Sequence, residues 1–366
     1  VSTPEASLWV KARAVLEQVL AEPVEARRAL VIEQCDGDRE LAGEVLSLLR
    51  SHGGAEAFSD ELGDAIDEGM GQEDDADRWL GQSVGGYRIV ELLGQGGMGF
   101  VYRAESGQDG VGAPAVAMKI LRGASWQAMS RERFRREREG LARLQHPNIA
   151  GILDTGDTPG GVPFFCMELV EGEPIDHYAD RNRLPVSGRI RLVLKVCEAV
   201  AHAHARQVIH RDLKPSNILV RETGEPTLLD FGIAKLLDPV TAGAPTDLSM
   251  QSVAFTPGYA SPEHMFGDPV SSASDVYSLG MLLYLLLAGA PPAFSFGPKR
   301  LPPAEVFAKC ADRPALAAAR ATTVAGLTQV LGGALGDILT KAGRLSASSR
   351  YPSVTELAEA LEGSLP

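Results

Sequence analysis

The stretch from Val208 to Val220, VIHRDLKPSNILV, constrains this chain more than any other part of its 366 residues. Two apolar runs flank a polar core in which Asp212 precedes Asn217 by five positions, and LLDFG supplies Asp230 thirteen residues further on. Two acids and an amide in this order suit phosphoryl transfer: one acid accepts a hydroxyl proton, and the other acid and the amide hold Mg²⁺ against phosphates. The alternative for this stretch alone is an ordinary polar loop.

A glycine cluster offers a place for phosphates. The stretch from Gly94 to Val101, GQGGMGFV, fits G-x-G-x-x-G-x-V, and backbone N–H groups without side chains nearby can approach phosphate oxygens closely. Taken alone, such a cluster is also compatible with a simple turn. A dinucleotide fingerprint needs a helix after the turn, whereas β-type residues follow this one. The context therefore argues against a Rossmann site.

A lysine and a glutamate between these two motifs are further candidates. Lys119, in VAMK, ends an apolar strand, where a lysine usually just marks the surface. Glu137 lies eighteen residues later in the charged helical stretch RERFRREREGLARL, where Glu132 and Glu139 compete with it. Its position nine residues before HPNI, and one turn before Leu141, favours Glu137 among the three.

Composition narrows the classes of partner. The net charge of −13 and the pI of about 5.1 argue against binding to nucleic acid or to an anionic membrane surface. Four widely spaced cysteines without a CxxC pair suit a reducing compartment. The apolar stretch Val276 to Ala290 is short for a membrane span and predicts a buried helix. We expect a cytoplasmic location without membrane contact. Val1 is not a natural start, so we expect this sequence to be a piece of a longer protein. Sequence after Pro366 could then carry a membrane anchor.

The pattern along the chain predicts three regions. Residues 1–52 have amphipathic helical spacing, and residues 53–80 read as an acidic, glycine-rich linker. Residues 81–366 form an α+β domain, with a small β-rich part over 81–169 and a larger helical part over 170–366. The helical extension is a candidate for homodimer formation or for docking a partner, and packing against the domain is the alternative.

Taken together, these motifs resemble the eukaryotic-type (Hanks-type) serine/threonine protein kinases of bacteria. GGMG and HRDLKPSN are similar to motifs of that bacterial branch, and TPGYASPEH is similar to the family's segment that ends in A/S-P-E. SDVYSLGMLLYLLLAG resembles the family's buried central helix, and RYPSVTELAEAL resembles its final helix. The resemblance runs from about Tyr87 to Leu365 and implies the two-lobed kinase fold after a small all-helical segment. It also implies that ATP and Mg²⁺ (or Mn²⁺) bind between the lobes.

The resemblance implies a role for each candidate residue. Asp212 would be the catalytic base, Lys214 would steady the transferred phosphate, and Lys119 would pair with the α/β-phosphates and with Glu137. The metal would be held by Asn217 and Asp230. The nucleotide would be contacted by Gly94, Gln95, Gly96, Gly97, Gly99, Val101, Ala117, Lys119, Met167, Glu168, Val170 and Leu219. Glu263 would pair with Arg350, and Asp275 would brace the catalytic loop.

Arg211 stands directly before the catalytic acid. In this family it would lie where it can pair with a phosphate on the segment between Asp230 and Glu263, and such a contact can order a loop. The segment offers Thr241, Thr246, Ser249, Ser252 and Thr256. Thr256 matches the substrate-docking threonine, and Thr246, Ser249 and Ser252 are favoured as sites of activating autophosphorylation.

The resemblance thus implies an enzyme that transfers phosphate from ATP to protein Ser or Thr hydroxyls in bacterial signalling. A nucleotide-binding pseudokinase that acts as a scaffold is the alternative, but Lys119, Asp212 and Asp230 are all kept. A small-molecule phosphotransferase fits less well, because TPGYASPEH resembles a peptide-docking segment. Phe255, where the family often has glycine, leaves the peptide preference open.

Overall fold

The computed structural model describes residues 76–96, 99–106, 115–121, 144–231, 258–265, 268–291 and 301–365, and six single residues before them. These six, each in a helix, are Lys11, Val15, Gln18, Gln34, Leu41 and Val45. The chain divides into two compact units, 79–244 with 253–366 and 1–78 with 245–252. Apart from these six residues and the end of the linker, the predicted extension and linker lie outside the described residues. Where the linker was expected to end, Ala76–Trp79 forms the 3-10 helix η1, and Trp79 is buried.

The β-rich part is one antiparallel sheet of six strands. Its order is β1-β2-β3-β4-β6-β5. The strands are β1 (Ser83–Val84), β2 (Tyr87–Gly96), β3 (Gly99–Ser106), β4 (Ala115–Leu121), β5 (Ile152–Asp157) and β6 (Pro163–Glu168). Buried and less buried residues alternate along most of β3, whereas the first five residues of β6 are all buried. Ile89, Tyr102, Met118 and Phe165 are fully buried. A strand follows the glycine cluster, as its β-type residues predict, and Gly96 pairs with Gly99 where β2 meets β3.

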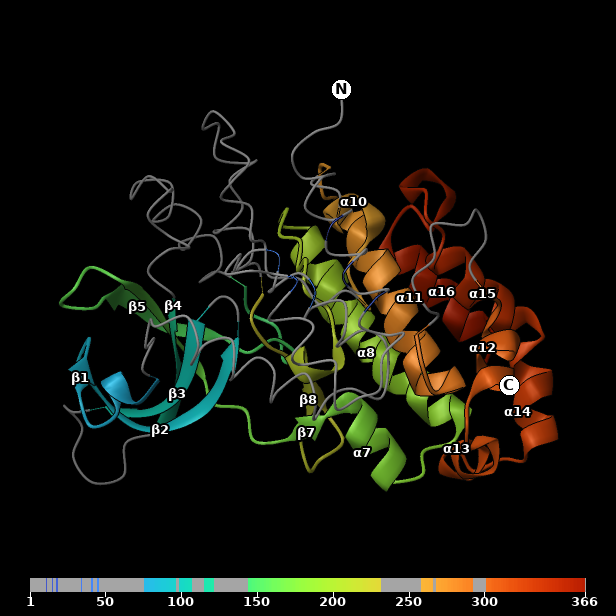
Figure 1. The fold of residues 1–366 in the computed structure, drawn as a ribbon, viewed down its shortest axis with the longest axis horizontal. Helices are drawn as coiled ribbons and strands as arrows, with labels where there is room; N and C mark the ends of the chain where they lie inside the picture. Colours follow the sequence, from blue (N-terminus) through green and yellow to red (C-terminus); the bar gives the residue numbers. More distant parts are fainter. Residues whose placement is uncertain are drawn as a thin grey trace. The chain divides into compact units, whose positions relative to one another are not determined.

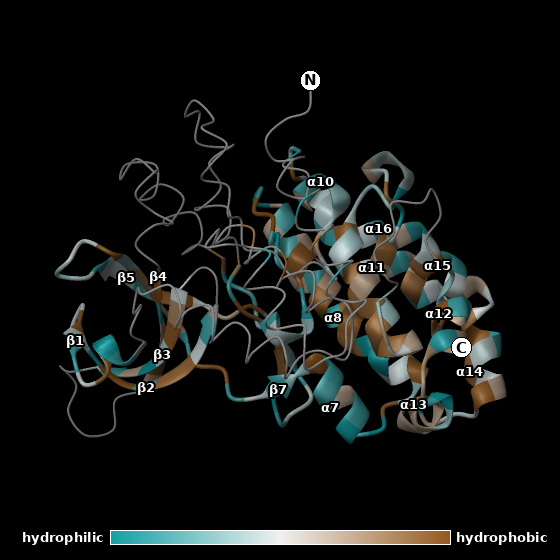
Figure 2. Ribbon diagram, in the orientation of Figure 1, coloured by the Kyte–Doolittle hydropathy of each residue, from teal (hydrophilic) through white to brown (hydrophobic). Residues whose placement is uncertain are grey.

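The helical part is built around two long helices. These are α8 (Val186–His204) and α11 (Ser272–Ala288), which pack on each other and carry hydrophobic residues along their length (Figures 1 and 2). The other helices are α7 (Ile175–Arg181), α10 (Pro262–Met265), α12 (Pro303–Lys309), α13 (Arg313–Ala319), α14 (Val324–Leu331), α15 (Ala334–Ala342) and α16 (Val354–Gly363). A small sheet, β7 (Glu173–Pro174), β8 (Ile218–Val220) and β9 (Pro226–Leu228), and the 3-10 helices η2 (Pro215–Asn217) and η5 (Ala347–Ser349) complete it.

Helix α11 is the buried core helix that its composition predicts. Almost all of its side chains are buried, and a capping box formed by Ser271 and Ser274 starts it. It ends at Gly289, whose φ of 92° is the left-handed conformation that glycine adopts without strain. Among the residues that the structure describes, no helix has the length and hydrophobicity to cross a membrane.

Two buried arginines bind the C-terminal end of α11. Arg189 donates to the carbonyl of Leu286 at 3.0 Å, and Arg320 donates to that of Leu287 at 2.8 Å. The last carbonyls of a helix have no partner within it, so cations here satisfy them and complement the helix dipole. Asp180 lies 2.6 Å from Arg189 and offsets part of this charge. Sequence reasoning did not find this cluster.

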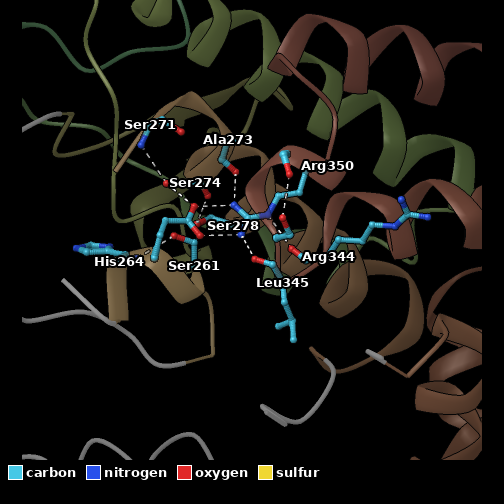
Figure 3. A network of polar contacts seen from close by, with 12 residues as sticks. Ser261, His264, Ser271, Ala273, Ser274, Ser278, Arg344, Leu345 and Arg350 are labelled. Atoms are coloured by element: carbon cyan, nitrogen blue, oxygen red, sulfur yellow. Dashed lines mark hydrogen bonds and ion pairs between the residues drawn. The ribbon is translucent and has the colours of Figure 1, made fainter. Parts of the chain in front are cut away.

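The predicted pair of Glu263 and Arg350 is confirmed. Figure 3 shows Arg350 among the polar groups around it. The fully buried guanidinium of Arg350 donates to both carboxylate oxygens of Glu263, at 2.6 and 2.7 Å. It also donates to the carbonyls of Ala273 and Leu345 at 2.8 Å, and the hydroxyl of Ser274 donates to Glu263 at 2.7 Å. Burial raises the pKa of Glu263, but the bonds from Arg350 and Ser274 outweigh it and lower this pKa to about 2. The pair therefore fixes α10 to the chain just before α16.

Replacing Arg350→Leu should destabilise the domain strongly, because the carboxylate of Glu263 is then left without its buried partner. We expect the free energy of unfolding to fall by about 3–5 kcal/mol, which corresponds to a fall of about 10 °C in Tm by calorimetry. The folded-state pKa of Glu263 lies below the ordinary value of 4.5, so its stabilisation is present above pH 4.5 and is lost as pH falls towards 2. The Tm difference from wild type should therefore shrink over that range. Exposed Arg344→Leu is the control; an equal Tm loss in both variants would contradict the role given to the pair.

Candidate functional site

A cavity of about 450 Å³ gathers the predicted residues. It lies between the six-stranded sheet and the loops around β8 and β9. The predicted residues that line it are Gly94, Gln95, Gly99, Val101, Ala117, Lys119, Met167, Glu168, Val170, Asp212, Lys214, Asn217, Leu219 and Asp230. Gly96 lies on β2, and Gly97 and Glu137 fall outside the described part of the chain. Nearly every described candidate is thus brought to one place.

The catalytic-loop candidates form one hydrogen-bonded cluster. Asp212 Oδ2 accepts from Lys214 Nζ and from Asn217 Nδ2, both at 2.9 Å. Burial raises the pKa of Asp212, but the charge and hydrogen bond of Lys214, together with the hydrogen bond from Asn217, outweigh it and lower the pKa below its ordinary value. Asp212 is therefore a carboxylate at neutral pH, which is the state that a proton acceptor needs.

A second cluster lies on the sheet side of the cavity. Lys119 on β4 is buried, and its Nζ lies 2.7 Å from Oδ2 of Asp230. The proposed partner Glu137 is outside the described residues, so this pairing with Asp230 is the contact that the structure describes for Lys119. Asp230 has a φ of 55°, a strained conformation for a residue other than glycine, of the kind that clusters at functional sites.

The glycine loop is fixed to the strand that carries Lys119. Gly99 has a φ of 148°, and a Cβ at this position would lie 2.1 Å from the carbonyl oxygen of Ile120. Only glycine permits this approach of β3 to β4. Gly99 therefore has a packing role in addition to the phosphate-binding role that the motif suggests.

Asn217 and Asp230 fit a divalent cation. The amide N–H of Leu229 donates to the carbonyl of Asn217 at 2.9 Å, which fixes the residue before Asp230 to the catalytic loop. Asn217 Nδ2 donates to Asp212, so ligation would use its amide oxygen. One carboxylate and one amide oxygen are hard donors, which suit Mg²⁺ because this ion keeps waters and phosphates as its other ligands. In the described part of the chain no cluster of three or more His, Cys, Asp or Glu offers a closed metal cage.

Asp275 on α11 braces the catalytic loop, as predicted. This fully buried carboxylate accepts the backbone N–H of His210 at 2.8 Å and that of Arg211 at 2.9 Å. His204 Nε2 lies 2.7 Å from it. Burial raises the pKa of Asp275, but the hydrogen bonds from His204 and from the backbone of His210 outweigh it and lower the pKa below its ordinary value. The two N–H bonds hold Arg211 at a left-handed φ of 71°.

His210 connects the two clusters, a role that sequence reasoning did not assign. The N–H of Asp212 donates to its Nδ1 at 3.3 Å, and its Nε2 lies 3.0 Å from the carbonyl of Leu229. These contacts suit a neutral ring with the proton on Nε2. Burial, the largest effect, lowers the pKa of His210, which agrees with a neutral ring. Its ring also packs against the edge of Phe231.

Five lining residues were not predicted: Leu93, Ala150, Leu169, Ser216 and Leu229. Leu93 stands directly before the glycine cluster and is one of the exposed large apolar residues. An apolar residue next to a glycine-rich tip is the signal that could have found it. Arg211 is buried, while Thr246, Ser249, Ser252 and Thr256 are outside the described residues.

The family comparison agrees with this geometry. Residues 87–301 match the family described as "Protein kinase domain". The chain belongs to the protein kinase family. Its sheet-rich and helical parts are the two lobes of the kinase fold, and the cavity lies between them.

Several curated bacterial proteins are similar to this kinase. The serine/threonine-protein kinase pkn3 of Myxococcus xanthus is 39% identical over 229 residues, which cover 60% of this chain and 40% of that protein. The DNA damage-responsive serine/threonine-protein kinase RqkA of Deinococcus radiodurans is 37% identical over 213 residues, covering 57% of this chain and 30% of that protein. The serine/threonine-protein kinase PknA of Mycobacterium tuberculosis is 38% identical over 214 residues, which cover 57% of this chain and 48% of that protein. The match thus spans less than half the length of each of these three relatives.

Proposed function

We propose that this kinase transfers the γ-phosphoryl group of ATP to serine and threonine hydroxyls of proteins, with Mg²⁺ (or Mn²⁺) as the metal. The observation that carries the proposal is the meeting of two clusters in one cavity. One is the carboxylate of Asp212 with Lys214 and Asn217, and the other is the pair of Lys119 and Asp230. The relatives named as serine/threonine kinases support the substrate class.

In the proposed reaction Asp212 accepts the proton of the attacking hydroxyl while the bond between the γ-phosphorus and ADP breaks. Lys214 and Lys119 offset the negative charge on the phosphates, which lowers the barrier because the transition state carries charge on its equatorial oxygens. Asn217 and Asp230 hold the metal, which neutralises phosphate charge when bound. The backbone of Glu168 and Val170 bonds the adenine edge, and the glycine loop covers the phosphates.

The pseudokinase alternative is not favoured. Such proteins usually lack the lysine, the catalytic-loop acid or the metal-binding acid, and here Lys119, Asp212 and Asp230 all line one cavity.

Replacing Asp212→Asn should abolish phosphate transfer but leave ATP binding intact. The amide keeps the shape of the side chain and removes the proton acceptor, so we expect a fall in kcat of about 10²–10⁴. The measurement is incorporation of labelled phosphate into a generic protein substrate with Mg-ATP, alongside ATP binding by titration. Exposed Asp157→Asn is the matched control and should transfer at the wild-type rate. Equal incorporation by the Asp212 variant and the wild type would refute the role given to this acid.

We further propose that phosphorylation of Thr246, Ser249 or Ser252 activates the enzyme through Arg211. Arg211 is tied by its backbone to Asp275 and directly precedes the base, so a phosphate bound to its guanidinium would order the substrate segment beside the catalytic loop. The acceptor is a protein Ser or Thr, and autophosphorylation would act in trans.

The helical extension over residues 1–52 stays a proposed dimer or docking module.

Alanine at all three sites should lower the activity about tenfold, the effect of losing one charge-assisted contact. The measurement is kcat of wild type, phosphatase-treated wild type and the triple variant. Treated wild type should resemble the triple variant, because both lack the phosphate. Full activity in the triple variant would end the switch hypothesis and leave the kinase activity unaffected.

A further inference from the structure

An ion pair ties the end of β6 to the β8–β9 hairpin. Glu168 is the last residue of β6, and Arg221 directly follows β8. The guanidinium of Arg221 donates through one terminal nitrogen to Oε1 of Glu168 at 2.6 Å. Its Nε donates to the hydroxyl of Thr227 on β9 at 3.2 Å, and Thr227 is buried.

Both ends of this ion pair belong to segments that line the cavity. Residues 167–170 line it on the β6 side, and Leu219 lines it from β8. Leu229 and Asp230, which follow β9, line it as well. The N–H of Glu168 donates to the carbonyl of Gly151 at 2.9 Å, so the residue directly before β5 holds the backbone of Glu168 while Arg221 holds its side chain.

We propose that Arg221 is a positioning residue for the nucleotide. By holding Glu168 against β8 and β9, it fixes the backbone that would bond adenine relative to Leu219 and Asp230. ATP then binds a preformed site and loses less free energy to ordering it. The inference rests on the proposed ATP-binding role of this cavity and adds to it a residue that does not line the cavity.

The degree of exposure limits the size of the effect. The side chains of Arg221 and Glu168 are 32% and 45% exposed, and exposed ion pairs generally contribute little. Arg221, however, is already held by the buried Thr227, so less side-chain entropy is lost when it pairs with Glu168. Being partly exposed, the pair should also weaken as salt concentration rises.

The same hairpin provides a matched control. Lys195 on α8 pairs with Glu225 at 2.6 Å, with side-chain exposures of 39% and 49%. Glu225 also precedes β9, but neither residue lines the cavity. Loss of this pair therefore removes a similar surface contact from the same hairpin without releasing the end of β6.

The test compares steady-state kinetics and direct ATP titration of the full chain. Arg221→Met should raise KM and Kd for ATP about two- to fivefold with little change in kcat, and high salt should reduce the difference. Arg221→Lys should give intermediate values, since it keeps the charge and loses the bond to Thr227. The double exchange Glu168→Arg with Arg221→Glu should recover part of the affinity. Lys195→Met should leave both constants unchanged.

The possible failures are distinguishable. If Arg221→Met and wild type bind ATP equally, or if Lys195→Met weakens binding as much, the positioning role is wrong while the kinase activity stands. A melting curve shows whether Arg221→Met folds. If it does not fold, Arg221→Lys decides, and a KM for ATP equal to that of wild type in Arg221→Lys would overturn the role of the bond to Thr227. A wild type that binds no ATP would overturn the proposed function and this inference with it.

Discussion

The catalytic apparatus depends on one buried carboxylate. Asp275 lies within α11, the most buried helix of the described chain, and carries its charge there because three nitrogen atoms lie within hydrogen-bond distance of it. A buried carboxylate without such partners would be protonated or would destabilise the fold. Two of these nitrogens are backbone amides of the catalytic loop. The loop is therefore attached to the rigid core of the helical lobe at the two residues that precede Asp212.

From that attachment a continuous set of hydrogen bonds runs through the catalytic loop to the residue before Asp230. His210 lies beside the N–H of Asp212 and the carbonyl of Leu229, and Leu229 in turn donates to Asn217. Asn217 closes the set by donating to Asp212. The proton acceptor and the proposed metal ligands are thus placed by one network rather than by independent contacts. We propose that Arg221 and Glu168 extend the same principle to the segment beside the adenine.

Sequence reasoning found the parts of the site that lie close together in the chain. Asp212, Lys214 and Asn217 fall within six residues, so their chemistry can be read from one motif. β2, β3, β4, β6 and α8 were predictable from their apolar patterns, and α11 because most of it is apolar. The short strands β5, β7, β8 and β9 were not predicted. The kinase resemblance added the pair of Glu263 and Arg350 and the brace at Asp275. Features that depend on long-range packing were missed, such as the pairing of Arg221 with Glu168 and the binding of Arg189 and Arg320 to the end of α11. Nothing in the local pattern around those residues indicates which distant group they meet.

The most direct test of the account is a structure with a non-hydrolysable ATP analogue and Mg²⁺ bound. We expect adenine beside Glu168 and Val170, phosphates between the glycine loop and Lys119, and a metal ion ligated by the side-chain oxygens of Asn217 and Asp230. Asp212 should face the γ-phosphate without touching the metal. Nucleotide bound outside this cavity, or a metal held by other side chains, would contradict the account.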